Sequence, residues 1–151
     1  MDDIDLRIIG LLTANARTSY AELAQEVGLS APSTAERVRR LEERGVVLGY
    51  EARVDPAALG CDLTAFVSVS VGDRAQTRAF LAAVAKLPEV VECHHVVGDD
   101  DYLLKVHVDG TRGLEALVTD RLKAIKGVTR TRTTVVLSTT LDRPVTAVGG
   151  A

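Results

Sequence analysis

The sequence predicts an α+β protein that consists of an all-helical N-terminal part and a C-terminal domain of strands and helices. Apolar residues recur at helical spacing up to Gly45, whereas β-branched residues and alternating patterns dominate after it. The second part then has the order strand, helix, strand, strand, helix, strand, which is the βαββαβ arrangement of ferredoxin-like domains. We expect a helical domain, a connecting strand and hinge, an α+β domain and a flexible tail at residues 1–45, 46–61, 62–140 and 141–151.

Three helices are predicted in the first part. Asp3 is the expected N-cap of the first helix, whose apolar residues recur every three or four positions. Ser19 would cap a second, short helix that ends at Gly28, a residue type that commonly terminates helices in the left-handed conformation. Ser30 would cap the third helix, which is expected to end at Gly45.

The chain after Gly45 favours extended structure. Val46 to Val54 is rich in β-branched residues and predicts a strand, which Asp55-Pro56 would end. In the second domain we expect strands at 63–71, 90–97, 102–108 and 128–138, with helices at 74–87 and 113–125.

The second and third helices are joined by about three residues around Gly28, which is the spacing of a helix-turn-helix. With the apolar residues of the third helix turned inward, hydroxyl and guanidinium groups form one outward stripe: Ser33, Arg37, Arg40 and Arg44. Such a stripe can contact DNA phosphates and the acceptor edge of guanine. The N-terminal turn of the helix lies nearest the bases in this motif, so the candidate interface also includes Ser30, Ala31, Pro32 and Thr34.

The same helix also has a simpler interpretation. The pairs Glu36–Arg40 and Arg39–Glu43 lie four residues apart and could serve only to solvate an exposed helix. The net charge of the chain is −3. Residues 1–55 hold ten Asp/Glu and seven Lys/Arg, and the rest of the chain holds eleven of each. A DNA-binding prediction therefore depends on local clustering of charge.

Several functional classes are not expected. Apolar stretches are shorter than the roughly 20 residues that a membrane-spanning helix needs, and the N-terminus does not resemble a secretory signal. We therefore expect a cytoplasmic protein with no membrane association, in which Cys61 and Cys93 are reduced. No nucleophile–base arrangement, GxGxxG or P-loop is present, so neither an enzyme nor a bound cofactor is predicted.

Cys93-His94-His95 and His107 are residue types that commonly bind metal ions. Neighbouring residues on a strand point to opposite faces, so His94 and His95 cannot share one centre. No further pair of cysteines or histidines completes four ligands. These residues are therefore interpreted as parts of strands, and no metal is predicted.

The chain resembles the leucine-responsive and asparagine-responsive regulators, the Lrp/AsnC or feast/famine family. The resemblance covers roughly residues 3–140 and rests on residues 5–9 with Leu12, 21–30, 37–50, 97–106 and 127–133. It implies a winged-type helix-turn-helix that binds double-stranded DNA, followed by a RAM domain, an ACT-like ferredoxin fold. It also implies dimers that associate into tetramers, octamers or larger rings, with the strand near 47–54 paired to that of a second copy.

The resemblance further implies a small effector, often an amino acid, bound between neighbouring dimers at the turn Gly98 to Asp101. The carboxylate of Asp101 can pair with an α-ammonium group, and backbone N–H groups near Gly98 can hold an α-carboxylate. The full candidate set is Val96, Gly98, Asp99, Asp101, Leu104, Thr133 and Thr134.

Asp100 departs from the family pattern, which commonly has an aromatic or other bulky residue there. Three adjacent carboxylates repel one another and could favour a basic effector, bind a cation, or form a solvated turn. An amino-acid pocket, a ligand-independent contact between copies and a metal site all remain open at this turn. We therefore expect an effector-modulated transcription regulator. The alternatives are an architectural DNA-organising protein without ligand response and a protein–protein regulatory module whose helix-turn-helix is unused.

Overall fold

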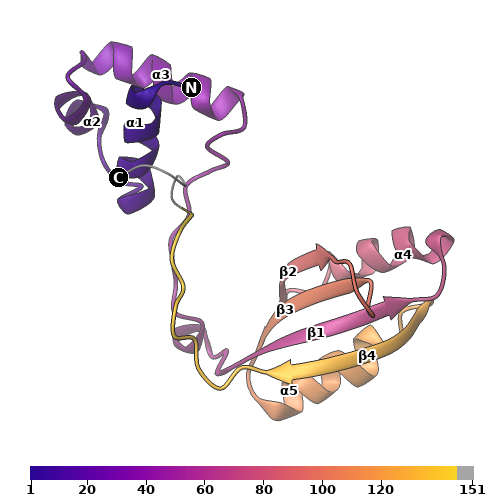
Figure 1. Ribbon diagram of the computed structural model, residues 1–151. Coiled ribbons are helices and arrows are strands. Elements are labelled where there is room, and N and C mark those ends of the chain that lie inside the picture. Colours follow the sequence, from indigo (N-terminus) through magenta and orange to yellow (C-terminus); the bar gives the residue numbers. More distant parts are fainter. Residues whose placement is uncertain (146–151) are drawn as a thin grey trace. The chain divides into compact units, whose positions relative to one another are not determined.

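The computed structural model describes residues 1–145 and divides the chain into two compact units, each with its own hydrophobic core (Figure 1). The helical unit contains Met1–Arg53 and the described residues after Thr140, and the sheet unit contains Val54–Thr140. Helices come first and a βαββαβ domain follows, so the predicted α+β class is confirmed.

The helical unit consists of α1 (Asp3–Ala14), α2 (Tyr20–Val27) and α3 (Ala31–Glu43). Ser19 and Ser30 cap α2 and α3 as predicted. The N-cap of α1 is Asp2, not the predicted Asp3. The reason is a reciprocal pair of hydrogen bonds at this helix end. The Asp2 carboxylate accepts from the Asp5 N–H, and the Asp5 carboxylate accepts from the Asp2 N–H. Apolar side chains from all three helices form the core: Ile8, Leu12, Leu23, Val38 and Leu41.

The strand predicted at 46–54 is not formed. Val47 packs against the helical core, but Val46, Leu48 and Tyr50 are exposed, and Leu48 is 93% exposed. A strand requires a neighbour that pairs with its N–H and C=O groups. No strand in the described part of the chain pairs with this segment. The β-branched composition therefore predicted a strand that the single chain does not form.

The sheet unit begins with the short 3₁₀ helix η1 (Pro56–Leu59), and its four strands are antiparallel in the order β2-β3-β1-β4. Its other elements are β1 (Leu63–Val71), α4 (Arg74–Val84), β2 (Val90–His95), β3 (Tyr102–Val108), α5 (Thr111–Glu115), η2 (Ala116–Leu122) and β4 (Val128–Val135). The second helix is α-helical only over α5 and continues as the π-helical η2. The helix α4 and the strands β2 and β4 end two or three residues earlier than predicted.

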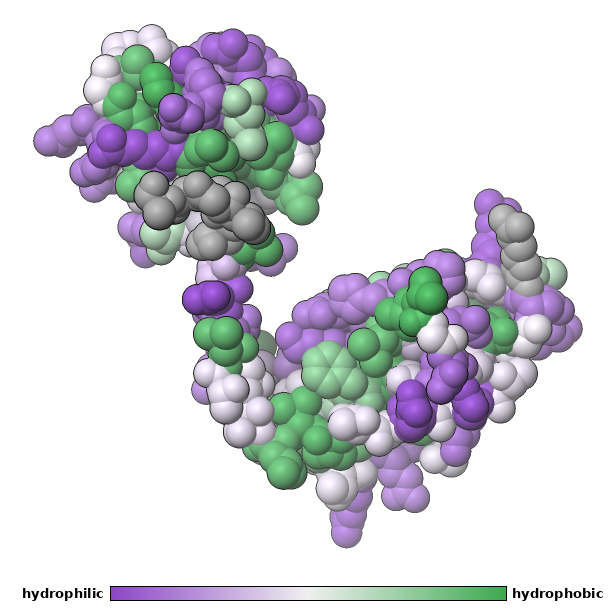
Figure 2. Space-filling view, viewed as in Figure 1, coloured by the Kyte–Doolittle hydropathy of each residue, from purple (hydrophilic) through white to green (hydrophobic). Residues whose placement is uncertain are grey.

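Residues alternate between two different environments along the central strands. Ala65, Val67 and Val69 on β1 are fully buried against α4 and α5, which cover one face of the sheet (Figure 1). The residues between them, such as Phe66, are only half-buried, because no described element of the sheet unit covers the other face. This open face carries hydrophobic and hydrophilic surface side by side (Figure 2).

The predicted flexible tail lies partly outside the described residues. Within the described part, the Arg53 guanidinium donates to the Asp142 carboxylate at 2.9 Å and to its backbone oxygen at 3.1 Å. Asp142 is thereby tied to the helical unit. Residues 146–151, which the prediction also assigned to the tail, are outside the described range.

The core of the sheet unit predicts that two neighbouring substitutions on α4 lower the free energy of unfolding by unequal amounts. Phe80→Ala should lower the free energy of unfolding by about 3–5 kcal/mol, because the fully buried ring packs against Tyr102 with centroids 5.0 Å apart. Leu81→Ala on the same helix is the matched control, since Leu81 is 40% exposed, and it should cost about 1 kcal/mol or less. Urea denaturation measures both variants. Equal losses would contradict this account of the core.

Candidate functional site

The link between α2 and α3 has helix-turn-helix geometry. The helix α2 ends at Gly28, whose φ of 70° lies in the left-handed region that glycine adopts without a steric penalty. The Leu29 N–H then donates to the Ala24 carbonyl at 3.0 Å. Ser30 accepts from the Ser33 N–H and begins α3. Three residues therefore separate the two helices, as the sequence predicted.

The helix α3 is rotated about its axis relative to the predicted orientation. Val38 and Leu41 are buried as expected, but Thr34 is buried with them and Ala35 only partly so. The Thr34 hydroxyl donates to the Ser30 carbonyl at 3.0 Å. Thr34 therefore belongs to the packed side of α3, and its assignment as a base contact was wrong. After the helix, Val46 is exposed and Val47 packs against the core.

The rotation also turns Arg37 toward α1 and away from the predicted outward stripe. Its Nη1 lies 2.8 Å from Asp2 Oδ2 and 2.7 Å from Asp5 Oδ1, and its side chain is 25% exposed. Hydrogen bonds with Asp2 and then Asp5 raise the pKa of Arg37, so its guanidinium stays charged. In this conformation Arg37 faces the protein, and Glu36 takes its place on the outward face.

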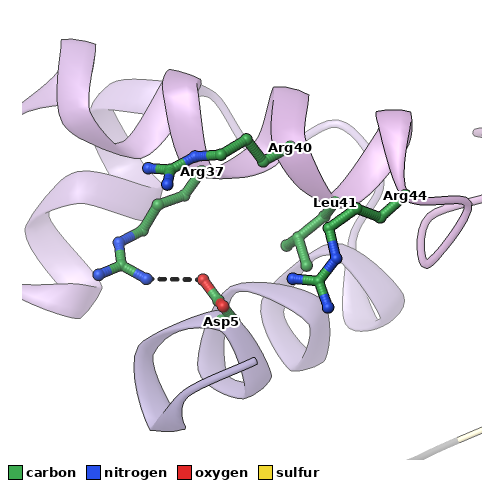
Figure 3. Close-up of a pocket in the computed structure, with 5 residues that line it drawn as sticks. All are labelled: Asp5, Arg37, Arg40, Leu41 and Arg44. Carbon is green, nitrogen blue, oxygen red and sulfur yellow. Dashed lines mark hydrogen bonds and ion pairs between the residues drawn. The ribbon is translucent and has the colours of Figure 1, made fainter.

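Arg40 and Arg44 are the exposed arginines that line the edge of α3 with Arg37 (Figure 3). A small surface hollow separates them from α1 and is lined by Asp5, Arg37, Arg40, Leu41 and Arg44. Arg40 lies 3.6 Å from Glu36, and Arg39 pairs with Glu36 and Glu43, so both predicted ion pairs on this helix are present.

The first turn of α3 lies at the surface next to these arginines. Pro32 and Ser33 are exposed and Ala31 is half-buried. The Ser30 hydroxyl donates to the Ser33 hydroxyl at 2.9 Å. We define the α3 surface as the exposed residues of the predicted interface: Ser30, Pro32, Ser33, Arg40 and Arg44.

In the sheet unit, the turn between β2 and β3 is held against the end of β1. The Val96 N–H donates to the Asp101 carbonyl at 2.9 Å, and the Asp101 N–H donates to the Val69 carbonyl at 3.0 Å. The Asp101 carboxylate accepts from the Val71 N–H at 2.7 Å. One oxygen of Asp101 thus has a structural role in closing the turn. Gly98 and Asp99 are exposed at its tip.

Asp100, the departure from the family pattern, is buried in an ion cluster. Its side chain is 5% exposed and accepts from the Ser70 hydroxyl at 2.8 Å and from Arg130 and Arg132 at 2.9 Å each. The Ser70 hydrogen bond and Arg130 lower the pKa of Asp100. Asp100 is therefore neither solvated nor free to bind a cation, which removes two interpretations of the acidic turn.

The sequence analysis missed the two arginines that neutralise Asp100. Arg130 and Arg132 are two residues apart on β4 and so lie on the same face of the sheet, opposite Ser70 and Ser68. The spacing of two residues between these arginines on a predicted strand was a usable signal for one shared acidic partner. The identity of that partner depends on the pairing of β1 with β4, which the sequence did not reveal.

Other members of the predicted effector set are not brought together within one chain. Leu104 pairs with Val67 of β1 and is fully buried under the helices. It therefore belongs to the core, and its assignment to the pocket was wrong. Thr133 and Thr134 are exposed on opposite faces of β4. They pair with Val67 and Phe66 in the middle of β1, whereas the turn meets the end of that strand. Val96 is half-buried beside the turn.

Two family profiles match the chain in the same order as its two units. The AsnC-type helix-turn-helix domain matches residues 1–42, and the Lrp/AsnC ligand binding domain matches residues 64–146. The chain belongs to the Lrp/AsnC family. The members it matches are transcriptional regulators, so the predictions of a DNA-binding transcription regulator and of a non-enzymatic protein are confirmed.

Individual Lrp/AsnC relatives match over nearly the whole chain. The transcriptional regulator LrpA of Mycobacterium tuberculosis is 42% identical over 139 residues, which is 92% of this chain and 91% of the relative. The regulator NMB0573 of Neisseria meningitidis, solved as a complex with L-Met, has a TM-score of 0.90 and 30% identity, covering 95% and 94% of the two chains. A feast or famine regulatory protein of M. tuberculosis complexed with L-methionine has a TM-score of 0.87 and 41% identity, covering 93% and 95%.

The three histidines of the candidate metal site have other contacts in this Lrp/AsnC chain, and Cys93 is a free cysteine. His94 pairs with Glu92, His107 with Thr64, and His95 stacks on Tyr102. Across residues 1–145, no group of three or more metal-ligating side chains is gathered at one point. The described helices also include none whose length and hydrophobicity would let it cross a membrane.

The buried ion cluster predicts a pH-dependent stability difference. Asp100→Asn should lower the melting temperature at pH 7, because Arg130 and Arg132 lose their shared carboxylate. The pKa of Asp100 is depressed in the folded state, so its contribution is present above the ordinary carboxyl range and is lost as the pH falls through the folded pKa. The difference from the parent chain should therefore shrink below about pH 4.

Thermal unfolding of both chains between pH 7 and about pH 3 measures this difference. Asp99→Asn is the matched control, since Asp99 is an exposed neighbour in the same turn, and it should change the melting temperature little at any pH. A loss for Asp100→Asn that is equally large at both ends of the range would contradict the charge pairing.

Proposed function

We propose that this Lrp/AsnC chain is a transcription regulator whose occupancy of DNA is modulated by an amino acid bound between its dimers. The observation that carries the proposal is the presence of an AsnC-type helix-turn-helix and an Lrp/AsnC ligand binding domain in one chain. Two structural relatives were solved with L-methionine, which supports an amino acid as the effector class. Such a regulator would act in the cytoplasm, where the chromosome lies.

The α3 surface is the proposed DNA interface. Arg40 and Arg44 would contact phosphates, because their guanidinium groups are exposed and Arg44 has no ion-pair partner among residues 1–145. Ser33 and Pro32 in the first turn would face the base edges, with Ser30 and Ala31 beside them. Base contacts in the major groove require this end of the helix to enter the groove first.

Dimerisation is proposed through the segment 46–54. This segment leaves Val46, Leu48 and Tyr50 exposed and has no strand neighbour in the described chain. The same segment of a second copy would supply the missing hydrogen-bond partners and bury these side chains. Dimers would then associate further into tetramers or octamers. Each helical unit offers few free positive charges, so several α3 surfaces on one assembly would raise the affinity for DNA.

The effector would bind at the turn Gly98 to Asp101. The backbone N–H groups of Gly98 and Asp99 have no acceptor within residues 1–145 and can receive an α-carboxylate. Asp101 Oδ1 remains for the α-ammonium group, because only Oδ2 is used by Val71. Thr133 and Thr134 lie too far along β4 to reach the turn of their own chain, so their hydroxyls would come from a neighbouring copy. Because the effector site would be divided between two copies, ligand binding would change how strongly the copies associate.

The DNA interface predicts a change in salt dependence. Arg40→Ala and Arg44→Ala should each reduce the slope of log affinity against log salt by about one, because each removes one phosphate contact. The measurement is fluorescence anisotropy with a duplex selected from random sequence. Arg7→Ala removes an equal charge from α1, where Arg7 pairs with Glu26, and should leave the slope unchanged. An unchanged slope in the Arg40/Arg44 double variant would exclude this interface.

The effector proposal predicts stereospecific stabilisation. L-methionine or another of the twenty amino acids, at 100 to 1000 times its Kd, should raise the free energy of unfolding by about 3–4 kcal/mol. Thermal-shift measurements provide the test, with D-methionine as the control because it has the same groups in the opposite hand. If none of the amino acids shifts the transition, the architectural DNA-organising function is favoured instead.

A further inference from the structure

An ion network joins the first residues of α1 to the middle of α3. Arg37 Nη1 lies 3.0 and 2.8 Å from the two carboxylate oxygens of Asp2 and 2.7 Å from Asp5 Oδ1. The partners are 35 and 32 residues away in the sequence. Figure 3 shows Arg37 reaching from α3 to Asp5 on α1, whereas Arg40 makes no such contact. The network therefore adds a polar connection between α1 and α3 to the apolar core that the two helices share.

The same carboxylates also begin α1. The Asp2 Oδ1 accepts the Asp5 N–H at 2.9 Å, and the Asp2 N–H donates to the Asp5 Oδ2 at 3.2 Å. The first turn of α1 and the guanidinium of Arg37 thus form one hydrogen-bonded unit. Movement of α3 along or around its axis would have to break this unit.

The burial of the network makes its loss costly. The Asp5 side chain is 13% exposed, compared with 59% for the Arg40 side chain on the outward face. Without Arg37, the mostly buried Asp5 carboxylate would lose its ion-pair partner. The orientation of α3 that exposes Ser33, Arg40 and Arg44 is the orientation in which this network is complete.

We infer that Arg37 is a positioning residue that sets the orientation of α3 for DNA binding through Asp2 and Asp5, and that it is not itself a phosphate contact. The inference rests on the proposed DNA-binding function and corrects one residue of the predicted stripe. The Arg37 guanidinium already donates to two carboxylates, so a phosphate would have to displace Asp2 and Asp5 to bind it. Arg40 and Arg44, one and two turns further along α3, retain the positive charge of this edge.

The rival account is that a DNA phosphate displaces the carboxylates and takes Arg37. The two accounts predict opposite effects of removing the acids. If Asp2 and Asp5 position α3, their loss weakens DNA binding. If they compete with phosphate for Arg37, their loss removes two negative charges, frees the guanidinium and tightens binding.

The first experiment uses the Asp2→Asn/Asp5→Asn chain. Asparagine is as good an N-cap as aspartate, so the start of α1 is retained while the charges are lost. We expect the Kd for duplex DNA to rise on the order of 10-fold and the melting temperature to fall by about 5 °C. Tighter DNA binding would overturn the inference. The single Asp2→Asn chain, which keeps the buried Asp5, gives the sign of the effect if the double variant does not fold.

The second experiment uses Arg37→Met, which retains an apolar stem and removes the charge. The Kd should rise to a similar extent, but the slope of log affinity against log salt should equal that of the parent chain. A slope reduced by about one would identify Arg37 as a phosphate contact and overturn the inference. Arg7→Met is the matched control, because its pair with Glu26 is long, at 3.6 Å, and exposed, and both readouts should stay near the parent values.

A stability measurement separates failure of this inference from failure of the DNA-binding proposal. A double-mutant cycle on Arg37 and Asp5 should give a melting-temperature loss for the double variant that is smaller than the sum of the single losses. This result would stand even if the parent chain bound no DNA. Additive losses would show that the two side chains are not coupled and would overturn the inference directly.

Discussion

The contact of Arg37 with Asp2 and Asp5 is the interaction on which the helical unit depends most. The helix α3 buries only a narrow apolar row, so its rotation about its own axis is weakly determined by hydrophobic packing alone. A charged hydrogen bond to the first turn of α1 adds the missing directional constraint. The exposed edge of α3, with Arg40 and Arg44, follows from that constraint.

The sheet unit uses the same chemistry for a different purpose. Asp100 holds Arg130 and Arg132 together with Ser70, and Asp101 closes the same turn onto the end of β1. Both units therefore pair arginines with carboxylates of the same unit. Because the chain is acidic overall, this pairing leaves few free guanidinium groups. A weak interface on each copy is complementary to the proposed association of copies, which would bring several such interfaces to one DNA.

The single chain leaves several surfaces without partners. The segment 46–54 has no strand to pair with among the described residues, and β2 and β4 are edge strands. Within the sheet unit, no described element covers one face of the sheet. A protein of this size can place a second copy on such surfaces and gain buried area that its small cores lack. The separation of Thr133 and Thr134 from the turn at Asp101 has the same explanation if the effector site is shared between copies.

Local signals in the sequence determined most of the fold. The caps at Ser19 and Ser30, the left-handed Gly28 and the βαββαβ order were all predicted, because each depends on neighbouring residues or on a simple period. The sequence motifs of both domains also indicated the family. These properties require no knowledge of which distant residues meet.

Only the tertiary structure decided which side chains are available for function. Thr34 and Arg37 are three residues apart and lie on the same face of α3, so a modest rotation of the helix turns both of them from solvent toward the protein. The partners of Arg37 and Asp100 lie about thirty residues or more away and are chosen by helix packing and strand register. Periodicity predicts that a helix or strand has an inner face, but contacts between distant segments decide where that face begins and which charges it leaves free.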